Sequence, residues 1–246
     1  MITRPKPKAK PKAKPKPKPK RPARPVKGRV RGPDQARSGT ALSRERIAAA
    51  AMALVDREGL AALSTRRLGD ELGCEAMSIY HHFPNKAHLM DALVDLMLVE
   101  ALIPAAGKGE WLERLRQAAH GFRAMALMHP KFFPFFAVHR LNTPSGVAYI
   151  NGVIGILREA GFSDRDAARY FREIGYYLTG AALDETAGYA KGPSAAEPVS
   201  NATIAANFPH LAAAAPYFQP EHFQATFETG LEILLEGVRR AREALS

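Results

Sequence analysis

The residues best suited to chemistry lie together in one stretch near the front of the chain, 63–86, which reads LSTRRLGDELGCEAMSIYHHFPNK. Thr65 and Arg66 lie near its start, Tyr80 lies in its second half, and Lys86 ends it. Hydroxyl, guanidinium and ammonium groups donate hydrogen bonds to phosphate oxygens, so this set is suited to holding a nucleic-acid backbone. The stretch therefore predicts recognition of a polyanion by hydrogen bonding.

The spacing of apolar residues predicts two short helices here, over 64–72 and 75–82, with Ser64 as the first N-cap and a sharp turn at Gly73. The second helix would be anchored to the core by Ile79. A short helix with one strong anchor and exposed Met and Tyr side chains favours an external partner. The residues expected to face mostly outward from it are Ala76, Met77, Ser78, Tyr80 and His81.

A third helix is expected to begin near Asn85, a good N-cap, with Lys86 as its first residue. A cation there opposes the helix dipole, but it is well placed if a phosphate docks at the free N–H groups. Thr65, Tyr80 and Lys86 would then flank one exposed helix, which is the arrangement of helix-turn-helix proteins that read a DNA groove. Spacing alone leaves open the alternative of a helical corner with ordinary surface residues.

The rest of the chain also reads as helical, because apolar residues recur at intervals of three and four without sustained alternation. Ser43 is a candidate N-cap for the first helix, and breaks at Gly59, Gly161 and Gly188 separate later stretches. We therefore expect an all-α protein with eight to ten helices. The stretch 189–216 has no clear apolar face and is expected to be a mobile loop with a short helix near 202–207.

The first 40 residues differ sharply in composition from the remainder. They hold 15 of the 35 Lys and Arg residues and one of the 24 acids, a net charge of +14, whereas residues 41–246 carry a net charge of −3. Repeated Pro-Lys and Ala-Lys pairs disfavour helix and cannot bury a core, so we expect an extended, disordered tail. Such a tail would bind DNA non-specifically by releasing counterions, or would serve only as a solubilising extension.

Several classes of protein are excluded by the sequence. No run of about 18 apolar residues is present, so no membrane span is expected. The single cysteine, Cys74, forms no intramolecular disulfide and suits a reducing cytoplasm, and the basic start has no apolar stretch that would make it a secretory signal. No zinc spacing, phosphate-binding loop or nucleophile elbow is present, so neither an enzyme nor a cofactor is predicted.

Residues 43–90, SRERIAAAAMALVDREGLAALSTRRLGDELGCEAMSIYHHFPNKAHLM, resemble the DNA-binding domain of the tetracycline-repressor (TetR) family of bacterial transcription regulators. The family pattern has a first helix ending near Gly-Leu, Ser/Thr-x-Arg at the start of the second helix, and Leu-Gly before the turn. It closes with Ile/Leu-Tyr-x-His/Tyr-Phe and a Lys at the start of the next helix. The sequence has all of these at the expected spacing.

The resemblance implies which residues contact DNA. Arg66 would reach a base, since arginine can contact O6 and N7 of guanine together. Ala76 and Met77 would lie against base edges with His82 nearby, and the Ala76 methyl suits contact with thymine. The family usually has a polar residue near Ala76 and often Gly or Pro at Met77, so the operator sequence is not inherited. The residues that would contact phosphates are Thr65, Ser78, Tyr80, His81 and Lys86.

The stretch 138–187, including YINGVIGILREAGFSDRDAARYFREIGYYLTGAALDET, is similar to the C-terminal domain of tetracycline repressors. In that family two helices from each subunit form a four-helix dimer interface, and the candidates here span 164–186 and 220–244. Gly within a helix costs about 1 kcal/mol relative to Ala, so close packing against a partner is expected to compensate. The alternative is a pair of loosely packed helices in a monomer. The glycines concerned are Gly175, Gly180, Gly230 and Gly237.

A pocket for an effector is expected in this C-terminal part. The run HPKFFPFFAVHR (129–140) concentrates four phenylalanines, which suits either ordinary core packing or the wall of an apolar cavity. His139 aligns with a metal-binding histidine of the family, with Asp184 or Glu185 near the acidic ligand, but no metal site is predicted because such lone residues are more often structural. The candidate lining residues are Trp111, Phe122, Met125, Phe132, Phe136, His139, Tyr149, Tyr176 and Tyr177.

These observations predict a disordered basic tail (1–40), a helix-turn-helix DNA-binding domain (41–103) and a helical regulatory and dimerisation bundle (104–246). The expected protein is a ligand-responsive repressor of the bacterial cytoplasm and nucleoid. It would bind a palindromic double-stranded DNA operator as a homodimer and be released by an apolar or aromatic small molecule. The competing hypothesis is a DNA-compacting protein that acts through its tail, which deletion of residues 1–40 would distinguish.

Overall fold

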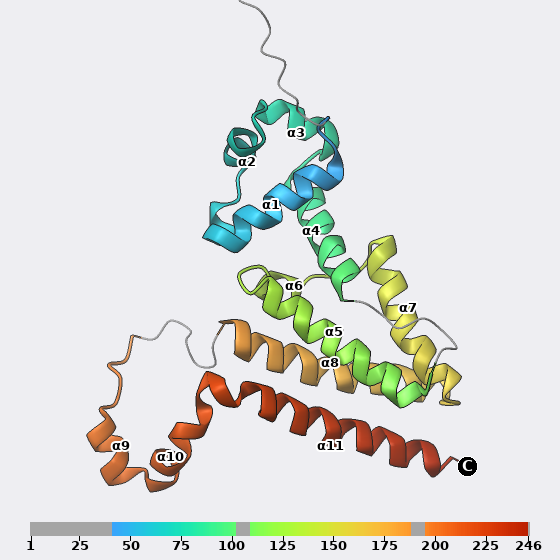
Figure 1. Cartoon of the computed structure of the whole chain (residues 1–246), viewed down its shortest axis with the longest axis vertical. Coiled ribbons are helices and arrows are strands. Elements are labelled where there is room, and N and C mark those ends of the chain that lie inside the picture. Colours follow the sequence, from blue (N-terminus) through green and yellow to red (C-terminus); the bar gives the residue numbers. More distant parts are fainter. Residues whose placement is uncertain (1–40, 102–108, 188–194, 246) are drawn as a thin grey trace, which may run out of the picture. The chain divides into compact units, whose positions relative to one another are not determined.

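The computed structural model describes residues 41–101, 109–187 and 195–245, and Figure 1 gives the order of their elements. These ranges contain eleven α-helices, three short 3-10 helices and no strand, so the predicted all-α class is confirmed with one α-helix more than expected. The tail and the boundary near residue 103 lie outside the described residues. The elements are α1 (Arg44–Glu58), η1 (Leu60–Ala62), α2 (Thr65–Leu72), α3 (Ala76–His82), α4 (Lys86–Glu100), α5 (Trp111–Met128), α6 (Phe133–Phe136), α7 (Pro144–Glu159), α8 (Asp164–Ala187), α9 (Asn201–Asn207), α10 (Pro209–Ala214), η2 (Ala215–Phe218), η3 (Pro220–His222) and α11 (Phe223–Glu243).

Side-chain caps set where the first helices begin. We call helices α1 to α4 the reader. The Ser43 hydroxyl accepts the Arg46 N–H at 3.2 Å at the start of α1, and Asn85 Oδ1 accepts the His88 N–H at 3.1 Å at the start of α4. Ser64 caps α2 in the same way. All three N-caps expected from the sequence are therefore confirmed, because each satisfies a backbone donor that the helix itself leaves free.

The core of the reader is built from apolar side chains of all four helices. Ile47 and Leu54 of α1, Leu68 of α2, Ile79 of α3 and Leu93 of α4 are each at most 1% exposed. Burying a side chain of this size contributes roughly 1.5–3 kcal/mol relative to leaving it in water. Helices as short as α2 and α3 are marginal in isolation, so this packing is what holds them in place.

The C-terminal helices pack around α8. Helices α5, α7 and α11 all contact α8, and α8 and α11 lie side by side (Figure 1). The chain turns from α7 into α8 at Gly161, whose φ of 96° is a left-handed conformation that favours glycine. Arg242 of α11 holds this corner, since its guanidinium donates a hydrogen bond to the Ala160 carbonyl. Buried apolar residues of α1 to α8 and of α11 form one continuous cluster.

The stretch before α11 is more helical than the sequence predicts. The short helix expected near 202–207 is confirmed as α9, but the loop prediction is wrong over α10, which packs against α9. Pro209 at the first turn of α10 explains the second helix, because it lacks an N–H where none is needed. No helix among the described residues could cross a bilayer. The large side chains exposed along this stretch are Phe208, Leu211, Tyr217 and Phe218.

Candidate DNA-binding site

The two short helices of the candidate site meet at a turn that requires glycine at two positions. Gly73 ends α2 with φ of 66° and ψ of 32°, as the sequence predicted. At Gly69 a Cβ would lie 2.8 Å from the Cys74 carbonyl oxygen, closer than the two atoms can approach. The Cys74 N–H also donates to the Gly69 carbonyl at 2.9 Å. The angle between α2 and α3 is therefore set by direct contact between backbones.

Helix α3 presents one side to the core and the other to solvent. Ile79 is 1% exposed, whereas Met77 is 64% exposed and Tyr80 is 39% exposed. The predicted orientation of these three residues is confirmed. Because Met77 and Tyr80 are large, they offer both apolar area and a hydroxyl to a partner outside the chain. The other residues of the helix, which are partly or fully exposed, are Ala76, Ser78, His81 and His82.

The donors expected to contact phosphates gather around the start of α2. The hydroxyl oxygens of Thr65 and Tyr80 lie 3.5 Å apart, although the two residues belong to different helices. Lys86 Nζ donates a 3.0 Å hydrogen bond to the Leu63 carbonyl, two residues before Thr65. An ammonium has three hydrogens, so Lys86 can keep this bond and still contact a phosphate oxygen. The structure thus brings together three side chains of which the first and last, Thr65 and Lys86, are 21 positions apart in the sequence.

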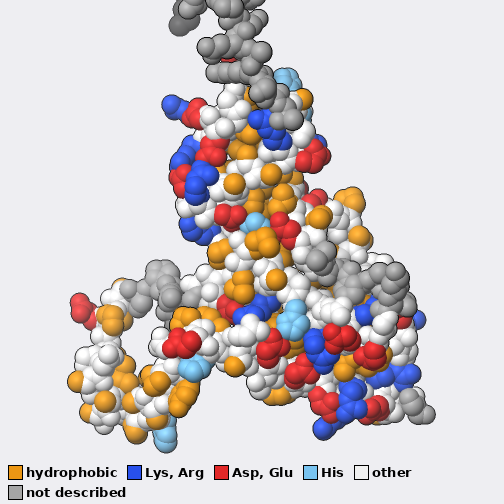
Figure 2. Space-filling model, viewed as in Figure 1, with side chains coloured by type: hydrophobic (Ala, Val, Ile, Leu, Met, Phe, Trp, Pro, Cys, Tyr) orange, Lys and Arg blue, Asp and Glu red, His pale blue; other side chains and the backbone are white. Residues whose placement is uncertain are grey.

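The two adjacent arginines of α2 have different surroundings. Arg67 forms an ion pair with Glu58 at the end of α1, at 2.5 Å, and this hydrogen bond holds the pKa of Glu58 below its usual value. Arg66 is exposed. On the face drawn in Figure 2, Lys and Arg side chains of the reader lie among Asp and Glu side chains. Arg66 therefore differs from Arg67 in that it forms no ion pair among the described residues.

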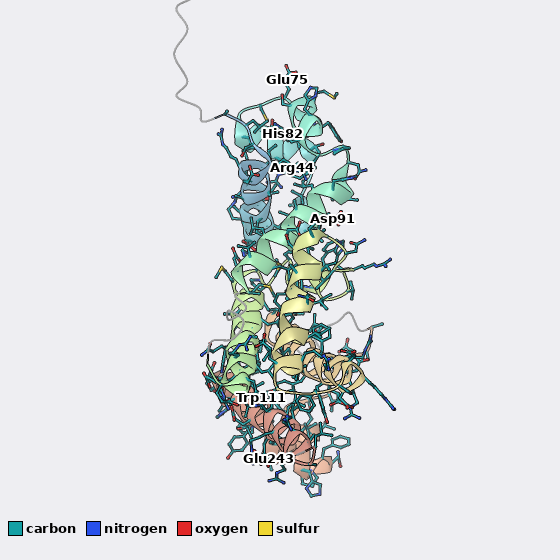
Figure 3. The ribbon with its side chains drawn as sticks, turned by 90° about the vertical axis from the view of Figure 1, so that its right-hand side faces the viewer. Arg44, Glu75, His82, Asp91, Trp111 and Glu243 are labelled. Carbon is teal, nitrogen blue, oxygen red and sulfur yellow. The ribbon has the colours of Figure 1, made fainter. Side chains whose placement is uncertain are left out.

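Arg44 is a residue of this site that sequence reasoning missed. Its guanidinium donates a hydrogen bond to the His82 carbonyl at the end of α3 and lies 4.3 Å from the centre of the Phe83 ring. Figure 3 shows Arg44 and His82 at the same end of the reader, with Glu75 beyond them. A cation is favourable at the C-terminal end of a helix, where carbonyls lack partners. Arg44 thus ties the first residue of α1 to the last residue of α3.

Three of the aromatic residues expected around an effector, Phe122, Phe132 and Phe136, lie in a cluster of α5 and the α6 region. The Phe122 ring lies 5.8 Å from Phe133 and 6.0 Å from Phe136, and Phe133 and Phe136 are 5.7 Å apart. Phe132 is fully buried and Met125 is 1% exposed. We call these five residues the aromatic cluster. It contains four of the nine predicted lining residues and adds Phe133.

The remaining lining candidates are placed elsewhere in the fold. Trp111 packs edge-to-face on Phe162 at 5.9 Å, and Tyr176 is 66% exposed on α8. The Tyr177 hydroxyl donates to the Phe227 carbonyl at 2.6 Å. Tyr149 lies on α7, where burial raises the pKa of its phenol. These four side chains, three tyrosines and one tryptophan, therefore do not line a common surface with the aromatic cluster.

His139, the last lining candidate, faces the reader. Its Nε2 lies 2.9 Å from Asp91 Oδ1 on α4, and its ring is 4.9 Å from that of Phe135. It borders a hollow of about 370 Å³ lined also by Leu60, Lys86, Ala87 and Met90 of the reader. Of the two acids considered with it, Glu185 forms a buried ion pair with Arg123 at 2.7 Å, and Asp184 Oδ1 is buried without a hydrogen-bond partner among the described residues. Within the described ranges, no group of three or more His, Cys, Asp or Glu residues could hold a metal ion.

Two family profiles match the chain. Residues 47–93 match the profile described as "Bacterial regulatory proteins, tetR family", and residues 103–242 match "Tetracyclin repressor-like, C-terminal domain". Among curated proteins, the chain is 32% identical over 206 residues to the tetracycline repressor protein class A from transposon 1721 of Escherichia coli. That alignment covers 82% of this chain and 93% of the relative.

Solved structures agree with these matches. A possible TetR family transcriptional regulator from Streptomyces coelicolor A3(2) is 34% identical with a TM-score of 0.68, over 81% of this chain and all of that chain. The Streptomyces coelicolor TetR family protein ActR, in complex with actinorhodin, is 28% identical with a TM-score of 0.66, over 82% of this chain and 99% of that chain. A TetR variant from Acinetobacter baumannii AYE in complex with minocycline is 25% identical with a TM-score of 0.61, over 82% and 99%.

Proposed function

The chain belongs to the tetR family of bacterial regulatory proteins, and we propose that it is a repressor that binds a palindromic DNA operator as a homodimer. The family is one of ligand-responsive transcription regulators and not of enzymes. The observation that carries the proposal is α3, a short helix with an exposed outer face on a frame fixed by glycines. Two such helices, one from each subunit, would enter successive major grooves about 34 Å apart.

The positions of the side chains support the proposed DNA contacts. Thr65, Tyr80 and Lys86 surround the start of α2 and would bind phosphates, together with Ser78 and His81. Arg66, exposed beside the paired Arg67, would bind a base edge. Phosphate contacts position a protein on the duplex, and base contacts give it sequence preference. The remaining base-facing residues of α3 would be Ala76, Met77 and His82.

The dimer is supported by the outer face of α8 and α11. Tyr176 and Ile233 are 66% and 71% exposed there, and a hollow of about 490 Å³ is lined by Gly230, Leu234 and Gly237 among others. Large apolar side chains beside glycines suit close packing against the same face of a second copy, because a two-fold interface pairs a surface with itself. The unit that binds an operator would therefore contain two chains.

The aromatic cluster supports release by an effector with flat apolar rings. The edge-to-face and stacked phenylalanines are buried, and flat apolar rings would pack among them; actinorhodin and minocycline are the molecules named with two structural relatives. An effector that favours one arrangement of the C-terminal helices would change operator affinity by the coupling free energy, typically about 1–3 kcal/mol.

Selection from a pool of random DNA duplexes tests the proposal. The bound fragments should share an inverted repeat, and sedimentation should find two chains on each duplex. Enrichment of no sequence, or of one half-site bound by a single chain, would contradict it. A DNA-compacting role would instead give binding to every duplex that disappears when residues 1–40 are removed.

A further inference from the structure

His129 lies at the C-terminal end of α5, and its ring is bound on both edges by the reader. Its Nδ1 lies 2.8 Å from Asp56 Oδ2 on α1, and its Nε2 lies 2.8 Å from Glu100 Oε2 at the end of α4. The residue is 6% exposed, so water does not replace either partner easily. One imidazole thus joins α5 to the ends of two reader helices.

The two distances determine how many hydrogens the ring carries. A neutral imidazole has one N–H, so it can donate to one carboxylate but would face the other with a lone pair. When both carboxyl groups are ionised, two acceptor oxygens at 2.8 Å are satisfied if both ring nitrogens carry hydrogen, which gives the imidazolium. Its positive charge then lies between two carboxylates, an arrangement in which both hydrogen bonds are charge-assisted.

The partners of His129 have few other bonds. Asp56 Oδ1 is buried and, among the described residues, has no hydrogen-bond partner, so Asp56 depends on His129 for its pairing. The other cations of this corner are engaged separately. Lys131 Nζ donates to the Arg57 carbonyl at 2.6 Å, and the Arg57 side chain pairs with Glu58 and Glu71.

The same corner leads directly into the aromatic cluster. The backbone N–H groups of Phe132 and Phe133 donate to the His129 carbonyl at 3.0 and 2.9 Å. Both phenylalanine side chains are fully buried. A displacement of the aromatic cluster would therefore reach the His129 ring through one continuous turn of the chain.

We propose that His129 is a positioning residue for operator binding: as an imidazolium it holds the ends of α1 and α4 against the α5–α6 corner and so couples the aromatic cluster to the reader. The coupling role rests on the proposed function, whereas the protonated bridge does not. Both hydrogen bonds of the bridge need an N–H at each ring nitrogen, so the bridge weakens when the ring loses a proton. Deprotonation leaves one carboxylate without its donor, and the arrangement described here loses stability.

The first test compares unfolding by urea from about pH 5.5 to about pH 8.5 in the wild type and three variants. The control is His120→Gln, on the same helix, because His120 is exposed and meets one carboxylate, Glu228, at 3.5 Å. In the wild type and this control the folding equilibrium constant should fall with rising pH, because a ring that loses one N–H gives up one of its two hydrogen bonds. His129→Gln should be less stable at acid pH and should lack this fall.

Glu100→Gln is the sharper variant. Its amide would donate to Nε2 of a neutral ring while Nδ1–H donates to Asp56, so both hydrogen bonds survive without the extra proton. We expect it to fold as stably as the wild type near neutral pH and to lack the fall at higher pH. Nitrogen NMR of the His129 ring should show both nitrogens protonated in the wild type at about pH 6. A single neutral tautomer there, or an equal pH dependence in all four proteins, would overturn the protonated bridge.

The second test concerns operator binding. If His129 positions the reader, the ratio of operator affinities of the wild type and His129→Gln should change with pH, while the ratio of the wild type and His120→Gln should stay constant. A constant ratio for His129→Gln would overturn the coupling role even if the bridge is protonated. Failure to find any operator would count against the proposed function, and the unfolding and NMR results would still decide the state of the bridge.

Discussion

The hydroxyl of Tyr177 on α8 lies directly over Gly230 on α11, where it donates a 2.6 Å hydrogen bond to the Phe227 carbonyl. A Cβ at position 230 would overlap the Tyr177 ring and its oxygen. Burial raises the pKa of this phenol, as expected for a hydroxyl held between two helices. Tyr177 and Gly230 therefore fix how closely the two longest helices of the described chain approach one another.

Gly230→Ala should destabilise the folded chain by about 1–3 kcal/mol, because Tyr177 must move and give up its bond to Phe227. Gly155→Ala on α7 is the control, since nothing lies within 4 Å of a Cβ there, the position is outside the proposed dimer face, and alanine is the better helix former. Urea unfolding measures both effects. A dilution series in sedimentation adds a second readout, because Gly237→Ala should weaken the proposed homodimer if a partner packs on that glycine.

Arg66→Ala should reduce operator affinity by about 1–3 kcal/mol, with the reduction confined to duplexes that keep the base pair it contacts. Lys86→Ala should instead weaken binding to all duplexes alike and lower its salt dependence, because a phosphate contact is the same in every sequence. Affinity measured on an operator and its single-base variants separates the two patterns. An unchanged base preference in Arg66→Ala would show that its assigned role is wrong.

Replacing thymine by uracil in the selected operator should weaken binding at the base pairs that face Ala76 and Met77. These side chains have no hydrogen-bonding group that could read an edge, so contact with the thymine methyl is the recognition open to them. The weakening should be absent at base pairs outside α3. Equal affinity for both duplexes at every position would contradict apolar reading by this helix.

Glu58→Gln should lower the free energy of unfolding at neutral pH and lose this effect in acid. The hydrogen bond from Arg67 holds the pKa of Glu58 below its usual value of 4.5, so the stabilisation is present above that value and is lost as the pH falls through the lower folded pKa. Urea unfolding of wild type and variant from about pH 3 to about pH 7 checks the convergence. A difference that persists at the acid end would exclude the ion pair as its cause.

Removing residues 1–40 should leave sequence preference intact and reduce the steepness with which affinity falls with salt. For every phosphate that the shortened chain no longer neutralises, the slope of log affinity against log salt should fall by about 0.9, and the deleted segment carries a net charge of +14. Titrations of specific and random duplexes at several salt concentrations measure both quantities. Disappearance of sequence preference in the shortened chain would favour the DNA-compacting hypothesis.

The features that the sequence predicted are those with local causes. Ser43, Ser64 and Asn85 cap helices through bonds to backbone three residues away, and Gly73 ends α2 through its own φ. Ile79 and Met77 face opposite ways because helical periodicity requires it. Such signals are complete within a few residues, so they can be read without knowing the fold.

The features that the sequence did not predict depend on residues far apart. Arg44 reaches the end of α3 across 38 positions, and His129 meets Asp56 across 73 and Glu100 across 29. Each is an ordinary residue in its own helix, and only the packing of helices brings its partner close. Composition is enough to predict the aromatic cluster, but it wrongly groups Tyr176 with it. Tyr176 points outward from α8, and that direction depends on tertiary packing, which composition does not reveal.

The close approach at Gly69 has a consequence for how such regulators diverge. Since the crossing of α2 and α3 rests on main-chain atoms at Gly69 and Cys74, the side chains of Ala76 and Met77 take no part in maintaining it. Substitutions at Ala76 and Met77 can therefore accumulate and redirect the protein to a new promoter without an intermediate that fails to fold. A gene duplicate carrying this turn could acquire its own regulon through a few changes on one exposed surface.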